Sequence, residues 1–231
     1  MFMPFWDPTY IVVIPAVLLA LYAQFKVTST YARFSQVPVS SGLTGAQAAE
    51  EILRRNGLSG VTVERTEGVL SDHYDPRARS LSLSLDVYSG SSVAAVGVAA
   101  HETGHAIQHA RGYAPLALRS AMVPTVQFGS WLAWPIFILG FLFHSGSMIQ
   151  LGVLIFSAIV AFTVVTLPVE FDASARAMRV LQEERMVTPD ELRGVRSVLS
   201  AAALTYVAAA AMAILQLLRM LMLANMGRRR D

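Results

Sequence analysis

Residues 93–109, VAAVGVAAHETGHAIQH, form an apolar, alanine-rich stretch that contains the pattern His-Glu-x-x-His. Residues four apart on a helix lie one above the other, so His101 and His105 can both reach one metal ion. Glu102 projects beside this pair, where it can hold a water molecule. We therefore expect a helix that carries two zinc ligands. The alternative is a pair of structural histidines, which would need hydrogen-bond partners if they were buried.

A catalytic zinc ion takes three protein ligands and leaves one position for water, so a third ligand is needed. His109 lies on the same helix face, but three ligands one turn apart would extend over about 12 Å along the helix, which is too far for one ion. We therefore expect His109 to form a hydrogen bond next to the metal site instead of binding the metal. Gln108 and Arg111 stand where a glycine and a histidine would complete the longer motif HExxHxxGxxH. The class of zinc proteases that has this longer motif is therefore excluded. The remaining candidate is Glu170, which follows an apolar tract and Pro168 at an expected helix start. Alternatively, Glu170 is an interfacial charge that the helix dipole stabilises.

The composition is that of a membrane protein. Of the 231 residues, 54% are hydrophobic and 15% are charged, and the mean hydropathy is +0.50, which excludes a disordered chain and an ordinary soluble domain. Three tracts are long enough to cross about 30 Å of hydrocarbon: residues 123–143, 148–167 and 198–223. We also expect residues 9–25 to form an anchor rather than a signal peptide, because Asp7 and no basic residue precedes them. Arg219, near the end of the last tract, is expected to extend its guanidinium to the interface.

Charge and cysteine content exclude several other kinds of site and partner. The chain has no cysteine, so thiolate zinc sites, disulfides and cysteine nucleophiles are excluded. The net charge is +2 and no basic stripe is present, so we expect no nucleic-acid partner. Basic residues gather at the membrane ends beside the proposed site and, in smaller number, at residues 228–230 on the opposite side. By the positive-inside rule, this predicts a cytoplasmic zinc site and exported termini.

Residues 26–119 are the only tract with the composition of a small folded unit, and we expect α+β structure there. A capping box that begins at Thr44 predicts a helix that ends at Asn56. Alternating residues around Val61 and over residues 80–85 predict short strands, paired antiparallel. In the last strand the leucines should face the core and the serines the solvent, with its far edge unpaired.

These segments predict a mainly α integral membrane protein with about four transmembrane helices and a small α+β unit. The expected parts, in chain order, are an N-terminal anchor (1–30), a zinc unit (31–120), a transmembrane hairpin (121–167), a helical segment with the third ligand (168–197) and a C-terminal transmembrane helix with a basic tail (198–231). The hairpin would return the chain to the same side of the bilayer. His105 and Glu170 could then share one ion.

The chain resembles the YugP-like membrane zinc metallopeptidases over nearly its whole length. The resemblance rests on three motifs: DHYDPR at 72–77, VGVAAHETGHAIQH at 96–109 and PVEFDAS at 168–174. It implies a gluzincin-like metalloprotease unit. In such a unit, His101, His105 and Glu170 bind zinc, and Glu102 is the catalytic acid and base.

A more distant similarity connects the chain with HtpX and CAAX prenyl proteases, which place the second glutamate in an ExxxD pattern. Here position 174 is Ser174 and the nearest acid is Asp172, and we expect both beside the metal ligands, where the aspartate of those families orients a histidine. His73 and Tyr74 either bind the oxyanion or form a structural hairpin loop. Arg176 either supports the oxyanion or pairs with Asp172.

The predicted activity is hydrolysis of peptide bonds, in which Glu102 takes the proton of the attacking water and passes it to the leaving amine. A protein or peptide substrate, including membrane proteins, would lie extended beside residues 80–85. One alternative is a catalytically silent zinc-bearing scaffold, which would not need Glu102. Another is an intramembrane protease, for which the apolar run at residues 93–100 is too short. The expected location is the cytoplasmic membrane of a bacterium, in contact with lipid, and the oligomeric state is not predicted.

Overall fold

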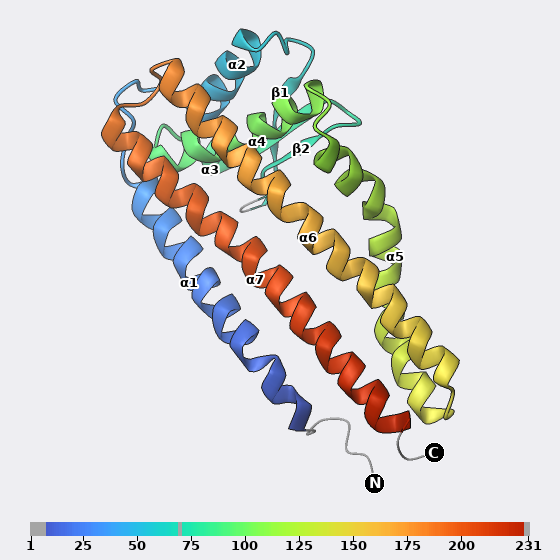
Figure 1. The fold of residues 1–231 in the computed structure, drawn as a ribbon. Helices are drawn as coiled ribbons and strands as arrows, with labels where there is room; N and C mark the ends of the chain where they lie inside the picture. The colour runs from blue at the N-terminus through green and yellow to red at the C-terminus, as the bar shows by residue number, and fades with distance from the viewer. Residues whose placement is uncertain (1–7, 69–70, 229–231) are drawn as a thin grey trace. The chain divides into compact units, whose positions relative to one another are not determined.

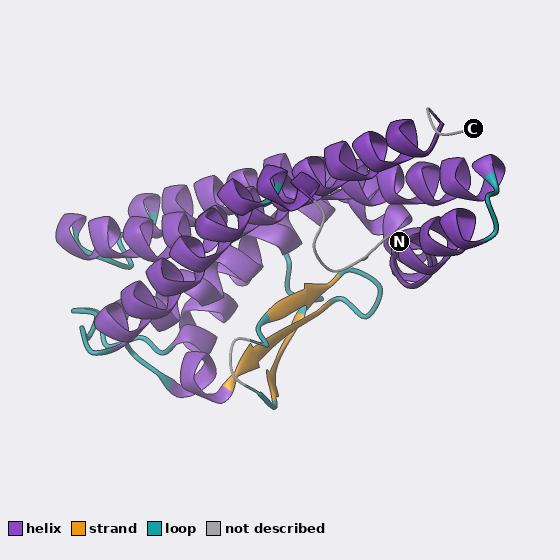
Figure 2. Cartoon of the chain, turned by 90° about the horizontal axis from the view of Figure 1, so that it is seen from below, coloured by secondary structure: helices purple, strands orange, loops and turns teal. Residues whose placement is uncertain are grey.

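The computed structural model describes residues 8–68 and 71–228 of the chain (Figure 1). Its helices, in chain order, are the 3-10 helix η1 (Pro8–Val12), α1 (Ile14–Ser35), α2 (Gly45–Arg55), α3 (Leu85–Ser89), α4 (Val93–Ala110), α5 (Ala114–Leu142), α6 (Gly146–Glu183) and α7 (Pro189–Arg228). Three short strands, β1 (Thr62–Thr66), β2 (His73–Asp75) and β3 (Ser80–Ser84), form one sheet (Figure 2). The described part of the chain is therefore mainly helical with one small sheet, as predicted.

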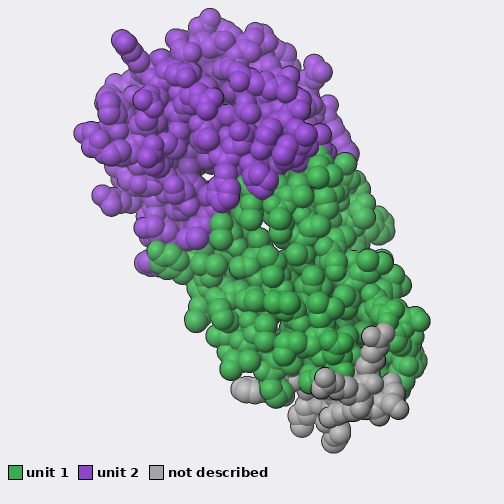
Figure 3. Space-filling model, viewed as in Figure 1, with its two compact units in different colours: residues 1–23, 118–167, 205–231 green, residues 24–117, 168–204 purple. Residues whose placement is uncertain are grey.

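The chain divides into two compact units (Figure 3). The first consists of residues 1–23, 118–167 and 205–231, and the second consists of residues 24–117 and 168–204. The His-Glu-x-x-His motif and Glu170 both belong to the second unit.

Three helices within the described residues are long and apolar enough to cross a membrane: α5, α6 and residues 189–226 of α7. By length and composition, these helices confirm the three predicted spans. The fourth predicted span, residues 9–25, is not confirmed. It is divided between η1 and α1, because α1 begins at Ile14 with Pro15 in its first turn. The second half of α1 also carries polar residues such as Lys26.

Side chains of α5, α6 and α7 form the core of the first unit: Ala133, Phe137, Phe156, Met220 and Leu223. Large apolar side chains such as Trp131 remain exposed on α5. Arg219, whose guanidinium was expected to reach the membrane interface, contacts helix η1. Its Nε donates to Thr9 Oγ1 at 3.2 Å, and its guanidinium carbon lies 3.5 Å from the ring centroid of Tyr10. Helix η1 therefore covers this charge, which is buried.

The sheet of the second unit has the order β1-β3-β2, so β3 is its central strand. β2, a strand that was not predicted, pairs antiparallel with β3, whereas β1 pairs parallel with β3. This pairing follows from the path of the chain, because the hairpin of β2 and β3 fills one edge of β3 and leaves the other edge to β1. The antiparallel pairing predicted between the strand around Val61 and the strand of residues 80–85 is therefore wrong, and so is the predicted free edge of β3.

Both faces of β3 are buried. Its leucines pack into the core, as predicted. The serines are buried as well, because acidic side chains cover them: Ser82 Oγ donates to Glu64 Oε1 at 3.0 Å, and Ser84 Oγ donates to Asp72 Oδ1 at 3.0 Å. The predicted solvent-facing side of this strand is therefore wrong.

Helix α2 confirms the prediction from the capping box. The backbone N–H of Gln47 donates to Thr44 Oγ1 at 3.2 Å, and the backbone N–H of Thr44 donates to Gln47 Oε1 at 3.0 Å. Asn56 caps the end of the helix. The buried face of α2 shares a core with α4 through Ile52 and Val96, so it supports the helix that carries the motif.

Candidate metal centre

Helix α4 positions both histidines of the motif. Ser92 caps its start by accepting a hydrogen bond from the backbone N–H of Ala95 at 3.2 Å, and Gly112, with φ of +63°, follows its end. The small side chains in its first half, including Ala99 and Ala100, are fully buried. The helix predicted from residues 93–109 is therefore confirmed.

Glu170 was predicted at a helix start, but it lies within α6. The helix continues through Pro168, which removes one backbone donor without ending it. A Cβ atom on Gly104 would lie 2.5 Å from the backbone oxygen of Ala173, so α4 and α6 can approach this closely only with glycine at that position. The close approach lets Glu170 reach the histidines of α4.

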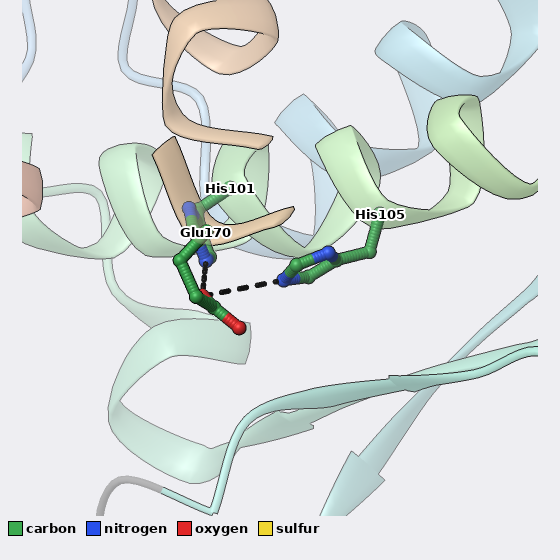
Figure 4. A group of neighbouring side chains, drawn as sticks. All are labelled: His101, His105 and Glu170. Carbon is green, nitrogen blue, oxygen red and sulfur yellow. Dashed lines mark hydrogen bonds and ion pairs between the residues drawn. The ribbon is translucent and has the colours of Figure 1, made fainter. Parts of the chain in front are cut away.

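The carboxylate of Glu170 lies beside the two imidazoles (Figure 4). Its Oε2 is 3.2 Å from His101 Nε2 and 3.6 Å from His105 Nε2, and one ligand atom from each residue lies within 4.8 Å of the others. Ligand atoms about 2.0–2.1 Å from a tetrahedral zinc ion are about 3.3 Å apart from one another. The structure thus brings together the three predicted ligands with a spacing that fits one zinc ion.

Negative charge dominates the surroundings of His105. Burial lowers the pKa of its imidazole, but the hydrogen bond with Glu170 and the charges of Glu102 and Glu170 outweigh burial and raise the pKa above its ordinary value. Surroundings that stabilise a proton on this imidazole also favour a metal cation in its place.

Glu102 directly follows the first histidine and is 8% exposed. Within the described residues, its carboxylate makes no hydrogen bond or ion pair. Its oxygens are not among the buried polar atoms that lack a hydrogen-bond partner, so they reach open space. A carboxylate that faces open space and has no partner among the described residues can act on water or substrate.

The second ring nitrogen of each histidine has a polar partner. Ser174 Oγ lies 3.1 Å from His101 Nδ1, and Gln108 Oε1 lies 3.0 Å from His105 Nδ1. Ser174 therefore lies beside His101, one of the candidate ligands. No role was predicted for Gln108 from the sequence. The available signal was its position three residues after His105, a spacing that brings side chains together on a helix.

Asp172 lies beyond Gln108 as seen from His105. Its Oδ2 accepts hydrogen bonds from Gln108 Nε2 at 2.7 Å and from Arg176 Nε at 2.5 Å. The guanidinium carbon of Arg176 also lies 5.7 Å from the ring centroid of Tyr113. Of the two roles considered for Arg176, the structure shows the pair with Asp172.

His73 and Tyr74 are neighbours on β2, so their side chains point to opposite faces of the strand. Tyr74 Oη lies 2.9 Å from His109 Nδ1, which joins β2 to α4. His73 is exposed, and its Nδ1 lies 2.8 Å from the backbone oxygen of Ser71. Among the described residues, the cluster of potential metal ligands contains none of these three side chains.

Comparison with known proteins shows the family of this chain. The model of a family described as "Putative neutral zinc metallopeptidase" matches residues 9–225. The chain belongs to this family. A curated relative from Bacillus subtilis (strain 168), "Putative membrane protease YugP", is 48% identical over 215 residues, which are 93% of this chain and 96% of the relative. No solved structure matches the chain.

Membership of this metallopeptidase family confirms the resemblance found in the sequence. It also supports zinc as the cofactor, and His101, His105 and Glu170 form a cluster that could hold a metal ion. Proteins or peptides are the substrates on which a peptidase acts.

Proposed function

We propose that this chain is a membrane-embedded, zinc-dependent endopeptidase. His101, His105 and Glu170 would hold the zinc ion, and Glu102 would act as general base and acid. The observation that carries the proposal is the combination of three convergent ligands with a buried carboxylate that has no hydrogen-bond partner among the described residues. A structural zinc site closes all four positions with protein ligands and needs no acid or base, so this combination favours hydrolysis over a catalytically silent scaffold.

Each residue would have a separate task during hydrolysis. When zinc is bound, it supplies a Lewis acid that polarises the scissile carbonyl and makes water a better nucleophile at neutral pH. Glu102 takes the proton of the attacking water and passes it to the leaving amine. Ser174 holds the ring of His101 in place through its hydrogen bond to Nδ1.

The substrate would bind along an edge of the sheet. The position predicted for it, beside residues 80–85, is wrong because β3 is the central strand. β2 has one edge that no described strand occupies, and its Tyr74 contacts His109 on α4. We therefore place an extended peptide along β2, where main-chain hydrogen bonds would hold it. Tyr74 is the proposed oxyanion stabiliser, because its phenol can exchange the neutral partner His109 for the oxyanion, whereas Arg176 is held by the charge of Asp172.

Metal removal tests this proposal. The chain purified in detergent should contain about one zinc ion and cleave casein or a peptide mixture. Treatment with a chelator should abolish cleavage, and added zinc should restore it, while circular dichroism verifies that the protein stays helical. A folded protein that holds zinc but cleaves no substrate would support the scaffold, and a protein without zinc would contradict both.

We propose that the protein lies in a bacterial cytoplasmic membrane with its zinc site on the cytoplasmic side. Three helices can cross a membrane, and the relative from Bacillus subtilis is described as a membrane protease. Nine basic residues lie near the membrane ends beside the site: Lys26, Arg33, Arg111, Arg119, Arg176, Arg179, Arg185, Arg193 and Arg196. The opposite side offers only residues 228–230, with Arg219 nearby, so the positive-inside rule supports this orientation. Substrates would then include membrane proteins, and α5 would contact lipid.

Reporter fusions should verify the orientation. Alkaline phosphatase folds only after export, so a fusion after Arg230 should be active, whereas a fusion at Gly112, before α5, should be inactive. A green fluorescent reporter that folds only in the cytoplasm should give the opposite pattern at both positions. Fluorescence after Arg230 without phosphatase activity there would reverse the proposed orientation.

A further inference from the structure

We propose that Gln108 is a positioning residue that fixes the ring tautomer of His105 and connects this ligand to Asp172. The inference rests on the proposed zinc site, because it concerns how one of its ligands is prepared. Gln108 is fully buried at the contact between α4 and α6, although its side chain is polar. A buried amide must find partners for both its oxygen and its nitrogen, and here each partner can be identified.

The partners of Gln108 determine which way its amide group points. Its nitrogen Nε2 lies 2.8 Å from the backbone oxygen of Val169 and 2.7 Å from Asp172 Oδ2. Both atoms are acceptors, because one is a carbonyl oxygen and the other belongs to a carboxylate that is paired with Arg176. A flipped amide would place its oxygen against two acceptors. The NH₂ group of Gln108 therefore faces α6, and its oxygen faces His105.

This orientation of Gln108 in turn determines where His105 carries its proton. Gln108 Oε1 lies 3.0 Å from His105 Nδ1, and an amide oxygen can only accept a hydrogen bond. His105 Nδ1 must therefore be the protonated nitrogen. The lone pair of the neutral ring is then on Nε2, the atom that lies 3.6 Å from Glu170 Oε2 in the ligand cluster. The ring is thus held in the tautomer that can bind a metal.

The two ligand histidines differ in this respect. Ser174 Oγ, the partner of His101 Nδ1, can donate or accept a hydrogen bond, so it restrains the ring without dictating the tautomer. The carboxylate of Asp172 cannot reach His105 directly and acts through Gln108. The chain therefore departs from a direct pair of aspartate and histidine by inserting one amide group.

Substitutions of Gln108 test the inference with two measurements. Gln108→Met keeps most of the volume but removes all three hydrogen bonds, and it should lower zinc affinity by about 10- to 100-fold in competition with a chelator. In zinc-free protein labelled with ¹⁵N-histidine, measured at alkaline pH where the His105 ring is neutral, His105 should change from the Nδ1–H tautomer to a mixture. Its signal is assigned by its loss in His105→Asn. If Gln108 only supported the fold, Gln108→Met would leave the His105 tautomer unchanged.

Charge-altering variants provide a second test if Gln108→Met fails to fold. Gln108→Glu keeps the shape but places a carboxylate against Asp172, so it should also weaken zinc binding. Adding Asp172→Asn to Gln108→Glu supplies a donor for that carboxylate and should recover part of the zinc affinity. Ser174→Ala serves as the matched control, because it acts on His101 and should leave the His105 signal unchanged.

The results separate this inference from the proposed function. The role of Gln108 would be overturned if Gln108→Met kept both the zinc affinity and the His105 tautomer of the wild type. It would also be overturned if the double variant recovered no zinc affinity. Failure of the wild type to bind zinc would contradict the proposed function. The tautomer of zinc-free protein would still decide the role of Gln108 in that case.

Discussion

The Glu102→Gln variant should bind as much zinc as the wild type but cleave peptides about 10²- to 10⁴-fold more slowly. The three ligands of the cluster are unchanged by this substitution, and the amide has nearly the same volume as the carboxylate. An amide cannot take a proton from water, so the step that generates the nucleophile is lost. Because no described residue bonds to this carboxylate, its removal should leave the fold intact. Zinc content and single-turnover cleavage, measured on the same preparation, check both halves of the prediction.

A matched control for this variant is Glu50→Gln, which makes the same chemical change on an exposed position of α2. It should retain wild-type zinc content and activity. Equal cleavage by Glu102→Gln and the wild type, after a mock purification has excluded contaminating protease, would rule out the enzymatic role. Loss of zinc from Glu102→Gln would instead mean that Glu102 supports the metal site directly.

The features that the sequence predicted well are those that neighbouring residues determine. The helix of residues 93–109 follows from a run of small residues between Ser92 and Gly112, and helix α2 follows from its capping box. Three apolar tracts were recognised because a span is defined by length and composition. Glu170 was selected from its place after an apolar tract and lies beside both histidines, although the expected helix start at this residue was wrong. Helix α6 continues through Pro168 and approaches α4 closely at Ala173.

The features that the sequence could not predict depend on contacts between distant segments. The pattern of β3 has a period of two, but a period does not say which strand takes each edge, so the parallel pairing with β1 was missed. The serines of β3 were expected in solvent because their acidic partners, Glu64 and Asp72, lie elsewhere in the sequence. Gln108 had no assigned role because its partners on α6 become visible only when the two helices are packed.

The Glu170→Ala variant should lose most of its zinc, which is a larger loss than any substitution of an outer partner causes. Glu170 is 2% exposed, and its Oε2 contacts both ligand histidines. Alanine would leave two histidines on one helix, and two neutral ligands bind zinc much more weakly than three ligands that include a carboxylate. Removing an outer partner typically costs about 10- to 100-fold in metal affinity, so Asp172→Ala and Ser174→Ala should retain zinc at concentrations where Glu170→Ala does not.

The competing assignment of the third ligand is tested in the same series. His109 is paired with Tyr74 through its Nδ1, and it lies outside the cluster of His101, His105 and Glu170. His109→Ala should therefore keep its zinc, measured by metal analysis after dialysis in detergent. Glu170→Gln serves as a further control, because it preserves the side-chain volume and separates the loss of a charged ligand from the opening of a cavity. If Glu170→Ala retained zinc and His109→Ala lost it, the third ligand would be His109. In that case α4 would have to bend, since its regular geometry places three successive turns too far apart for one ion.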